Sequence, residues 1–138
     1  MIETARKEHW DEVYSSRSEH DVSWYQPDPR LSLELIRAYA PAESGRIIDV
    51  GGGASTLIDR LLERSFARLA VLDISDVALS RSIQRLGDLA RKVEWITADI
   101  TKVEDIGTFD VWHDRAVFHF LTSPEDRKRY VELARRTI

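Results

Sequence analysis

Short apolar runs and segments with the apolar period of a helix follow one another along the chain. Four apolar runs predict buried strands, at residues 47–50, 69–72, 93–97 and 109–112. Helical periodicity is found between or after these runs, at residues 57–62, 75–86 and 124–136. Strands that alternate with helices are typical of a parallel sheet covered on both faces. The pattern therefore predicts an α/β fold with a three-layer, Rossmann-like, doubly wound and mainly parallel sheet.

The first third of the chain is more polar and has a different pattern. Residues 3–14 predict an amphipathic helix on the outside of the domain, and residues 31–40 predict a second helix that the next proline ends. Between them, two closely spaced prolines exclude a regular helix, so Trp24 and Tyr25 are expected on a loop or lid. These aromatics either pin the loop to the core or cover a bound ligand and its substrate.

The stretch at residues 45–56 contains three consecutive glycines directly after the first predicted strand. Gly51, Gly52 and Gly53 are followed by a new helical period, which predicts a strand, a tight turn and a helix. Glycine allows the backbone to come close to a ligand, and the start of the new helix presents free N–H groups nearby. The stretch therefore predicts a site for a nucleotide-like ligand.

The glycine spacing separates two kinds of nucleotide site. A dinucleotide fingerprint G-x-G-x-x-G that starts at Gly51 would need a third glycine where Thr56 stands, which disfavours a nicotinamide dinucleotide. The pattern acid-x-Gly-x-Gly at the end of a first strand is met by Asp49, Gly51 and Gly53. On these residues the chain resembles the class I S-adenosylmethionine (SAM) dependent methyltransferases. The resemblance implies their fold, SAM as cofactor, S-adenosylhomocysteine (SAH) as product, and methyl transfer to a small molecule or a protein lysine.

Acidic residues stand at the ends of three predicted strands, where ligands bind in sheets of this kind. Asp49 lies in an otherwise apolar strand, so its carboxylate needs hydrogen-bond donors from the glycine turn or from a ligand. Asp73 lies 20 residues beyond Gly53. A carboxylate there can accept both hydroxyls of an adenosine ribose, or it can cap the helix that begins near Ser75. Asp99 follows the third strand, where Asp is also a common turn residue.

The resemblance assigns a role to each of these positions. It implies that the three glycines line the cofactor and that Asp49 lies near the methionine part of SAM; an Asp that only braces the turn is the alternative. Asp73 would bind the ribose, and Ile74 would offer an apolar face to the adenine. Asp99 would accept the adenine amino group, with the backbone N–H of Ile100 facing a ring nitrogen.

His113, Asp114 and Arg115 follow the fourth predicted strand, and we expect a turn there beside the glycine loop. The resemblance implies that residues at this point lie next to the cofactor and its reactive methyl group. His113 is the first candidate for a base that removes a substrate proton, because imidazole ordinarily titrates near neutral pH, and Asp114 is the second. Either residue could instead only shape the pocket. Arg115 is a candidate to hold a substrate carboxylate, or to pair with Asp114 or Asp110.

Composition and charge narrow the classes of partner. The net charge of −4 and the pI near 5.6 give no basic footprint, so a nucleic-acid partner is not indicated. The chain has no cysteine and only four histidines, which gives little support to metal catalysis. Methyl transfer from a sulfonium needs positioning and exclusion of water rather than a metal. With no apolar run long enough to cross a bilayer, we expect a cytoplasmic protein without a membrane partner.

The family domain has seven strands in the order 3-2-1-4-5-7-6, whereas four are predicted here. We expect one domain over residues 1–138, with N-terminal helices and a lid at residues 1–44 and a C-terminally incomplete SAM-binding core at residues 45–138. A sheet that ends at strand four exposes an unpaired edge, so the chain is either a truncated product or is completed by a homodimer. A non-catalytic SAM-binding or SAH-binding module and an NAD-type oxidoreductase fragment are the alternative functions.

Overall fold

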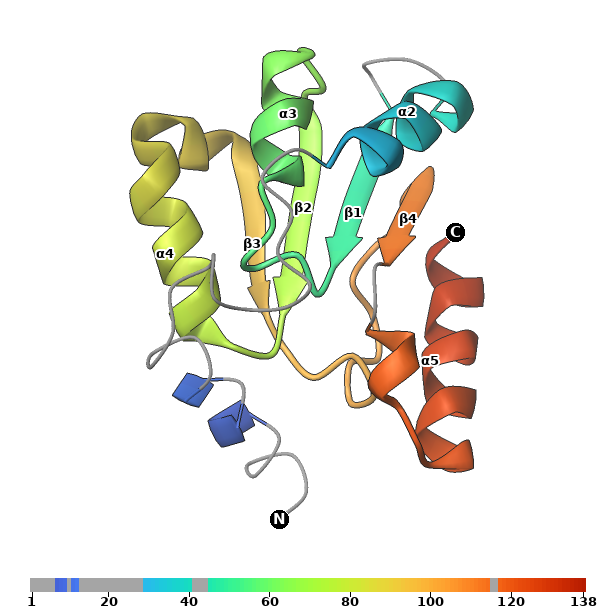
Figure 1. Ribbon diagram of the computed structural model, residues 1–138. Helices are drawn as coiled ribbons and strands as arrows, with labels where there is room; N and C mark the ends of the chain where they lie inside the picture. Colours follow the sequence, from blue (N-terminus) through green and yellow to red (C-terminus); the bar gives the residue numbers. More distant parts are fainter. Residues whose placement is uncertain (1–6, 10, 13–28, 41–44, 115–116) are drawn as a thin grey trace.

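The structure, a computed structural model, describes residues 7–9, 11–12, 29–40, 45–114 and 117–138. Its helices are α2 (Arg30–Tyr39), α3 (Leu57–Glu63), α4 (Asp76–Leu86) and α5 (Pro124–Thr137), with the 3₁₀ helices η2 (Gly87–Lys92) and η3 (Phe118–Phe120). Its strands are β1 (Arg46–Val50), β2 (Arg68–Asp73), β3 (Val93–Thr97) and β4 (Val111–Asp114) (Figure 1). Residues 7–9 and 11–12 are helical, so the helix expected at residues 3–14 is described only in part. None of the described helices is long and apolar enough to cross a membrane.

The four strands form one parallel sheet in the order β3-β2-β1-β4, with β1 between β2 and β4. Figure 1 shows the four arrows pointing in the same direction. This arrangement confirms the α/β, doubly wound fold that the sequence pattern predicts. Because all strands run the same way, their carboxyl ends lie at one edge of the sheet.

Alternate residues of each strand point to opposite faces of the sheet, and both faces are covered. On one face, the strands pack against apolar side chains of α2, α3 and α4, namely Leu33, Ile36, Leu57, Ile58, Leu61 and Leu79. On the other face, Ile48 and Leu72 belong to a cluster with Tyr130 and Leu133 of α5. The structure therefore has the three layers that the sequence predicts.

The fourth strand begins two residues later than expected, at Val111–Asp114 rather than at residues 109–112. Phe109 is buried, but its N–H donates to the carbonyl of Thr137 in α5 (2.8 Å) and not to β1. Its side chain lies in the buried cluster that contains Tyr130 and Leu133 of α5. An apolar run in the sequence cannot distinguish such burial from strand pairing.

Core packing around α3 gives a first prediction. Leu61 has no exposed surface, whereas Leu89 of η2 is 46% exposed. We expect Leu61→Ala to lower the free energy of unfolding by about 2–5 kcal/mol, because it leaves a cavity between α3 and the sheet. The control, Leu89→Ala, should cost less than about 1 kcal/mol. Urea denaturation followed by circular dichroism measures both, and equal losses would contradict this assignment of the core.

Candidate functional site

The carboxyl ends of β1, β2 and β4 meet where the chain turns through residues 51–56, called the glycine loop from here on. Val50, the last residue of β1, lies opposite Leu72 of β2 and Asp114 of β4. In Figure 1 the glycine loop leaves the lower end of β1, close to the loop that joins β2 to α4. The acidic residues at the ends of the neighbouring strands are therefore the neighbours of this loop.

Close packing explains why glycine stands at the first two positions of the loop. Gly51 has a φ of +75°, and a Cβ there would lie 2.0 Å from Cγ2 of Val117. Its N–H donates to the carbonyl of Leu72 (2.6 Å), which ties the loop to β2. At Gly52, a Cβ would lie 2.1 Å from Oδ2 of Asp49. The loop is thus enclosed by the segment after β4 on one side and by a buried carboxylate on the other.

Asp73 connects the glycine loop to the start of α4. Its Oδ2 accepts a hydrogen bond from the N–H of Gly53 (3.0 Å), and its Oδ1 accepts one from the N–H of Ser75 (2.9 Å). Ser75 itself is the N-cap of α4, and its hydroxyl oxygen accepts a hydrogen bond from the N–H of Ala78. Burial raises the pKa of the Asp73 carboxyl to about 6, although both backbone hydrogen bonds favour its ionised form. A buried carboxyl that titrates near 6 is typical of a functional site.

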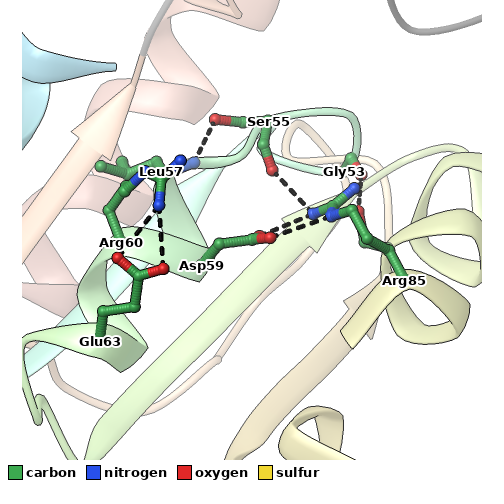
Figure 2. Close-up of polar contacts among 8 residues, drawn as sticks. Gly53, Ser55, Leu57, Asp59, Arg60, Glu63 and Arg85 are labelled. Atoms are coloured by element: carbon green, nitrogen blue, oxygen red, sulfur yellow. Dashed lines mark hydrogen bonds and ion pairs between the residues drawn. The ribbon is translucent and has the colours of Figure 1, made fainter. Parts of the chain in front are cut away.

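The other side of the loop is held by α3 and α4 (Figure 2). The carbonyl of Gly53 accepts a hydrogen bond from Oγ of Ser82. Arg85 of α4 donates to the carbonyl of Ser55 (3.3 Å) and pairs with both carboxylate oxygens of Asp59 in α3 (2.8 and 3.1 Å). These contacts hold the loop between the two helices.

Asp49 is paired with His113, a contact that the sequence analysis missed. Asp49 is only 2% exposed, and its Oδ1 lies 2.8 Å from Nδ1 of His113 in β4. The other ring nitrogen, Nε2, lies 2.9 Å from Oγ of Ser32 in α2. Oδ2 of Asp49 is buried, and no described residue gives it a hydrogen bond. The histidine therefore takes the place of the expected donor from the glycine turn, and one oxygen is left without a donor from the part of the chain that the structure describes.

His113 and Asp114 lie in a strand, and the turn expected at these residues is wrong. They are the last two residues of β4, because its parallel pairing with β1 continues to the end of both strands. Asp114 accepts hydrogen bonds from the N–H groups of Val117 (2.8 Å) and Phe118 (3.0 Å), and from the hydroxyl of Tyr130. Burial and the neighbouring carboxylate raise the pKa of Tyr130. These contacts favour the interpretation of Asp114 as a residue that shapes the pocket.

Asp99 lies just beyond the carboxyl end of β3. It is buried, and its Oδ1 accepts from both the N–H and the hydroxyl of Thr101 (2.9 and 2.7 Å), which is a turn contact. The preceding N–H, of Ala98, donates to the carbonyl of Asp73 (3.0 Å). Ile100 is buried and Ile74 is half-buried. The three acidic residues singled out in the sequence therefore lie along one edge of the sheet.

Three of the expected site residues, Trp24, Tyr25 and Arg115, lie outside the residues that the structure describes. Their roles in a lid and in substrate binding stay predictions. Part of the N-terminal segment is described, and Asp11 accepts a hydrogen bond from the hydroxyl of Ser75 (2.5 Å), close to the start of α4. Within the described ranges, no group of three or more histidines and carboxylates is arranged to hold a metal ion.

Comparison with known protein families and curated proteins identifies related sequences. A family profile described as a methyltransferase domain matches residues 48–138. An eEF1A lysine and N-terminal methyltransferase from Danio rerio is 25% identical over 125 residues, which are 90% of this chain and 18% of that protein. The protein of the same description from Mus musculus is 22% identical over 86% of this chain and 17% of its own length. The chain thus spans less than a fifth of these relatives.

Solved structures of similar fold are also methyltransferases by description. A SAM-bound amino pentose methyltransferase from Micromonospora echinaspora aligns with a TM-score of 0.63 at 20% identity, covering 94% of this chain and 51% of that one. A glycopeptide N-methyltransferase aligns with a TM-score of 0.69 at 18% identity, covering 94% and 56%. The chain corresponds to about half of each structure, and at this identity the likeness supports the fold alone.

The contact between the glycine loop and Asp49 gives a second prediction. We expect Gly52→Ala to lower the free energy of unfolding by about 1–3 kcal/mol, because the new methyl group displaces the buried carboxylate. The same change in an Asp49→Ala background should cost at most half as much, because the obstructing group is gone. Urea denaturation of the four proteins completes the cycle. Additive losses would mean that the carboxylate is not what excludes a side chain at this position.

Proposed function

Because this chain belongs to the methyltransferase domain family, we propose that it binds SAM at the glycine loop and catalyses transfer of its methyl group. The observation that carries the proposal is the edge of the sheet, where the glycine loop adjoins the buried Asp49 and Asp73 and where the buried Asp99 follows β3. The family match favours methyl transfer over the hydride-transfer alternative. A SAM-binding module without catalysis remains the second candidate, since the chain corresponds to about half of the solved methyltransferases.

Two features of the site fit a ligand with cationic and hydroxyl groups. Oδ2 of Asp49 is buried without a donor among the described residues, and the ammonium of the methionine part of SAM would supply one. Asp73 holds one backbone N–H on each oxygen, and each oxygen retains a lone pair for a ribose hydroxyl. Both carboxylates are also close to where a Cβ of Gly52 or Gly53 would lie, so only glycine leaves space for them.

The remaining assignments concern the adenine and the reacting group. Asp99 and the N–H of Ile100 would bind the polar edge of adenine, and Ile74 would contact its face. The bound cofactor supplies an electrophilic methyl group on a sulfonium. The residues of this chain bind it, orient the acceptor in line with the leaving sulfur and keep water out. Trp24 and Tyr25 are proposed to cover the cofactor and the acceptor, and Arg115 to hold a carboxylate of the substrate.

The methyl acceptor is proposed from the descriptions of the relatives, which name two classes of substrate. The curated relatives are described as methyltransferases of a lysine and of the N-terminus of eEF1A, and the structural neighbours as methyltransferases of sugars and glycopeptides. We therefore propose a protein lysine or a small molecule as the acceptor. A cytoplasmic location stays a prediction.

The role of Asp73 gives a third prediction. Calorimetric titration should detect binding of SAH and none of NADH. Ribose hydroxyls stabilise the ionised carboxylate, so binding lowers a pKa that stands near 6 in the free protein. The affinity for SAH should therefore be constant well above pH 6 and fall below it, by about tenfold at pH 5. Binding near pH 6 should also release protons. The buffer takes up these protons, so the measured heat of binding should depend on which buffer is used.

The matched variant is Asp73→Asn, which preserves size but cannot ionise. We expect it to bind SAH about 10–100-fold more weakly at pH 7.5 and to lose the pH dependence between pH 5 and 7. Asp88→Asn, at an exposed position in η2, is the control and should behave as wild type. A pH dependence retained by Asp73→Asn would show that another group controls binding.

We also propose that two copies of the chain associate along β4. Among the described residues, β4 pairs with β1 only, so its outer edge carries unpaired backbone groups. The adjacent helix α2 packs against β4 and exposes Leu31 (67%), Leu35 (50%) and Tyr39 (78%), four residues apart on one helix face. An apolar stripe beside an open strand edge is suited to a homodimer contact.

This surface gives a fourth prediction. Light scattering coupled to size-exclusion chromatography should give the mass of a dimer at micromolar concentration. Leu35→Lys should shift the chain toward monomer, because a charge is costly in an apolar contact. The control is Leu89→Lys, at an exposed position outside the stripe. A monodisperse wild-type monomer would contradict the proposed homodimer.

A further inference from the structure

Three side chains from distant parts of the sequence form a continuous chain of hydrogen bonds beside the glycine loop. Oγ of Ser32 in α2 lies 2.9 Å from Nε2 of His113 in β4. Nδ1 of the same ring lies 2.8 Å from Oδ1 of Asp49 in β1. The nucleophile, base and orienting carboxylate of many enzymes have this order and these distances.

For a neutral His113 ring, the chemistry of the three groups sets where the protons lie. A carboxylate has acceptor sites only, so Nδ1 of His113 carries the hydrogen and donates it to Asp49. Nε2 then has a lone pair and accepts the hydrogen of the Ser32 hydroxyl. The lone pairs of Ser32 Oγ can then accept a proton from a bound substrate.

Asp49 is the most buried of the three hydrogen-bonded groups. Ser32 is half-buried, the His113 side chain is 16% exposed, and the Asp49 side chain is 3% exposed. Asp49 also adjoins Gly52 of the glycine loop, where the proposed function puts the cofactor. Ser32 therefore retains some exposed surface, whereas the Asp49 carboxylate is buried next to the proposed cofactor site.

We propose that Ser32, His113 and Asp49 form a proton relay that accepts the proton lost by the methyl acceptor, an inference that rests on the proposed function. The acceptor's lone pair forms a bond to the methyl carbon while the carbon–sulfur bond breaks and its electron pair stays on sulfur. The acceptor's proton passes to Ser32 Oγ, and the hydroxyl proton of Ser32 passes to Nε2 of His113. Asp49 stabilises the imidazolium that results, and the proton later returns to water.

The relay defines the chemical class of the acceptor. Its reacting atom carries a proton that must leave, as in an amine or a hydroxyl group. Thioethers and tertiary amines have no such proton and would gain nothing from Ser32. In this arrangement Ser32 is the catalytic residue that touches the substrate, whereas Asp49 is a positioning residue for His113.

Nuclear magnetic resonance tests the relay without turnover. In ¹⁵N-labelled protein, His113 is assigned by comparison with His113→Gln and should be the neutral Nδ1–H tautomer. Ser32→Ala removes the donor to Nε2 and should move its ¹⁵N resonance toward that of an unbonded ring nitrogen. Ser80→Ala, at an exposed position in α4, is the control and should leave the resonance unchanged. An Nε2–H tautomer, or a resonance that does not respond to Ser32→Ala, would overturn the relay.

Kinetics with labelled SAM test the catalytic step. The acceptors are lysine-containing peptides, amino sugars and hydroxylated aromatic compounds. We expect Ser32→Ala to lower kcat about 100-fold or more and to leave SAH affinity within about threefold. Ser32→Thr should restore most of the rate, because it restores the hydroxyl. Ser80→Ala should match wild type.

The outcomes separate the relay from the proposed function. If wild type methylates an acceptor and Ser32→Ala retains its kcat, the relay is wrong and the proposed function stands. If Ser32→Ala loses SAH affinity and kcat together and Ser32→Thr does not restore the rate, Ser32 only holds α2 on the sheet. If wild type binds SAH and methylates none of the panel, the proposed catalysis and the step at Ser32 both fall.

Discussion

The parallel pairing of β1 with β2 on one side and β4 on the other is the constraint on which the site depends. It sets Asp49 opposite His113 and Val50 opposite Leu72, so that Asp73 follows at the edge beside the glycine loop. A slip of one residue in either pairing would turn the side chains of that strand to the opposite face. The buried apolar residues on both faces of the sheet prevent such a slip, so the core determines the geometry of the site.

The site places two carboxyl groups, those of Asp49 and Asp73, in a buried part of the fold. Burial raises the pKa of Asp73 to about 6, and Oδ2 of Asp49 has no donor among the described residues. Neither feature helps the chain to fold, because a buried carboxylate without full hydrogen bonding costs free energy. Such costs are tolerated where a function depends on them. Nearby hydrogen bonds offset part of this cost. Backbone N–H groups donate to Asp73, His113 contacts Asp49, and a contact from α4 holds the glycine loop.

Local patterns in the sequence predicted the elements well, and the exceptions have a common cause. The order of strands and helices, the glycine turn and the start of a helix near Ser75 are as predicted, because each depends on residues close together in the chain. The limits of β4 were wrong, and the hydrogen bond between Asp114 and Tyr130 was not predicted. Phe109 is buried in the cluster that contains Tyr130 and Leu133 of α5, and Asp114 accepts a hydrogen bond from Tyr130 of the same helix. Both depend on a helix that comes later in the chain.

By itself the sequence determined which elements form and which acidic residues end the strands, because period, turn chemistry and capping act over a few residues. Only the tertiary structure decided which side chains meet. Asp49 and His113 are 64 residues apart, and Ser32 and His113 are 81 apart. No local period marks such a pair, since its contact depends on strand register and on where α2 packs. The residue types that carry the chemistry are therefore present in the sequence, and their connection into a relay comes from the packing of α2 on the sheet.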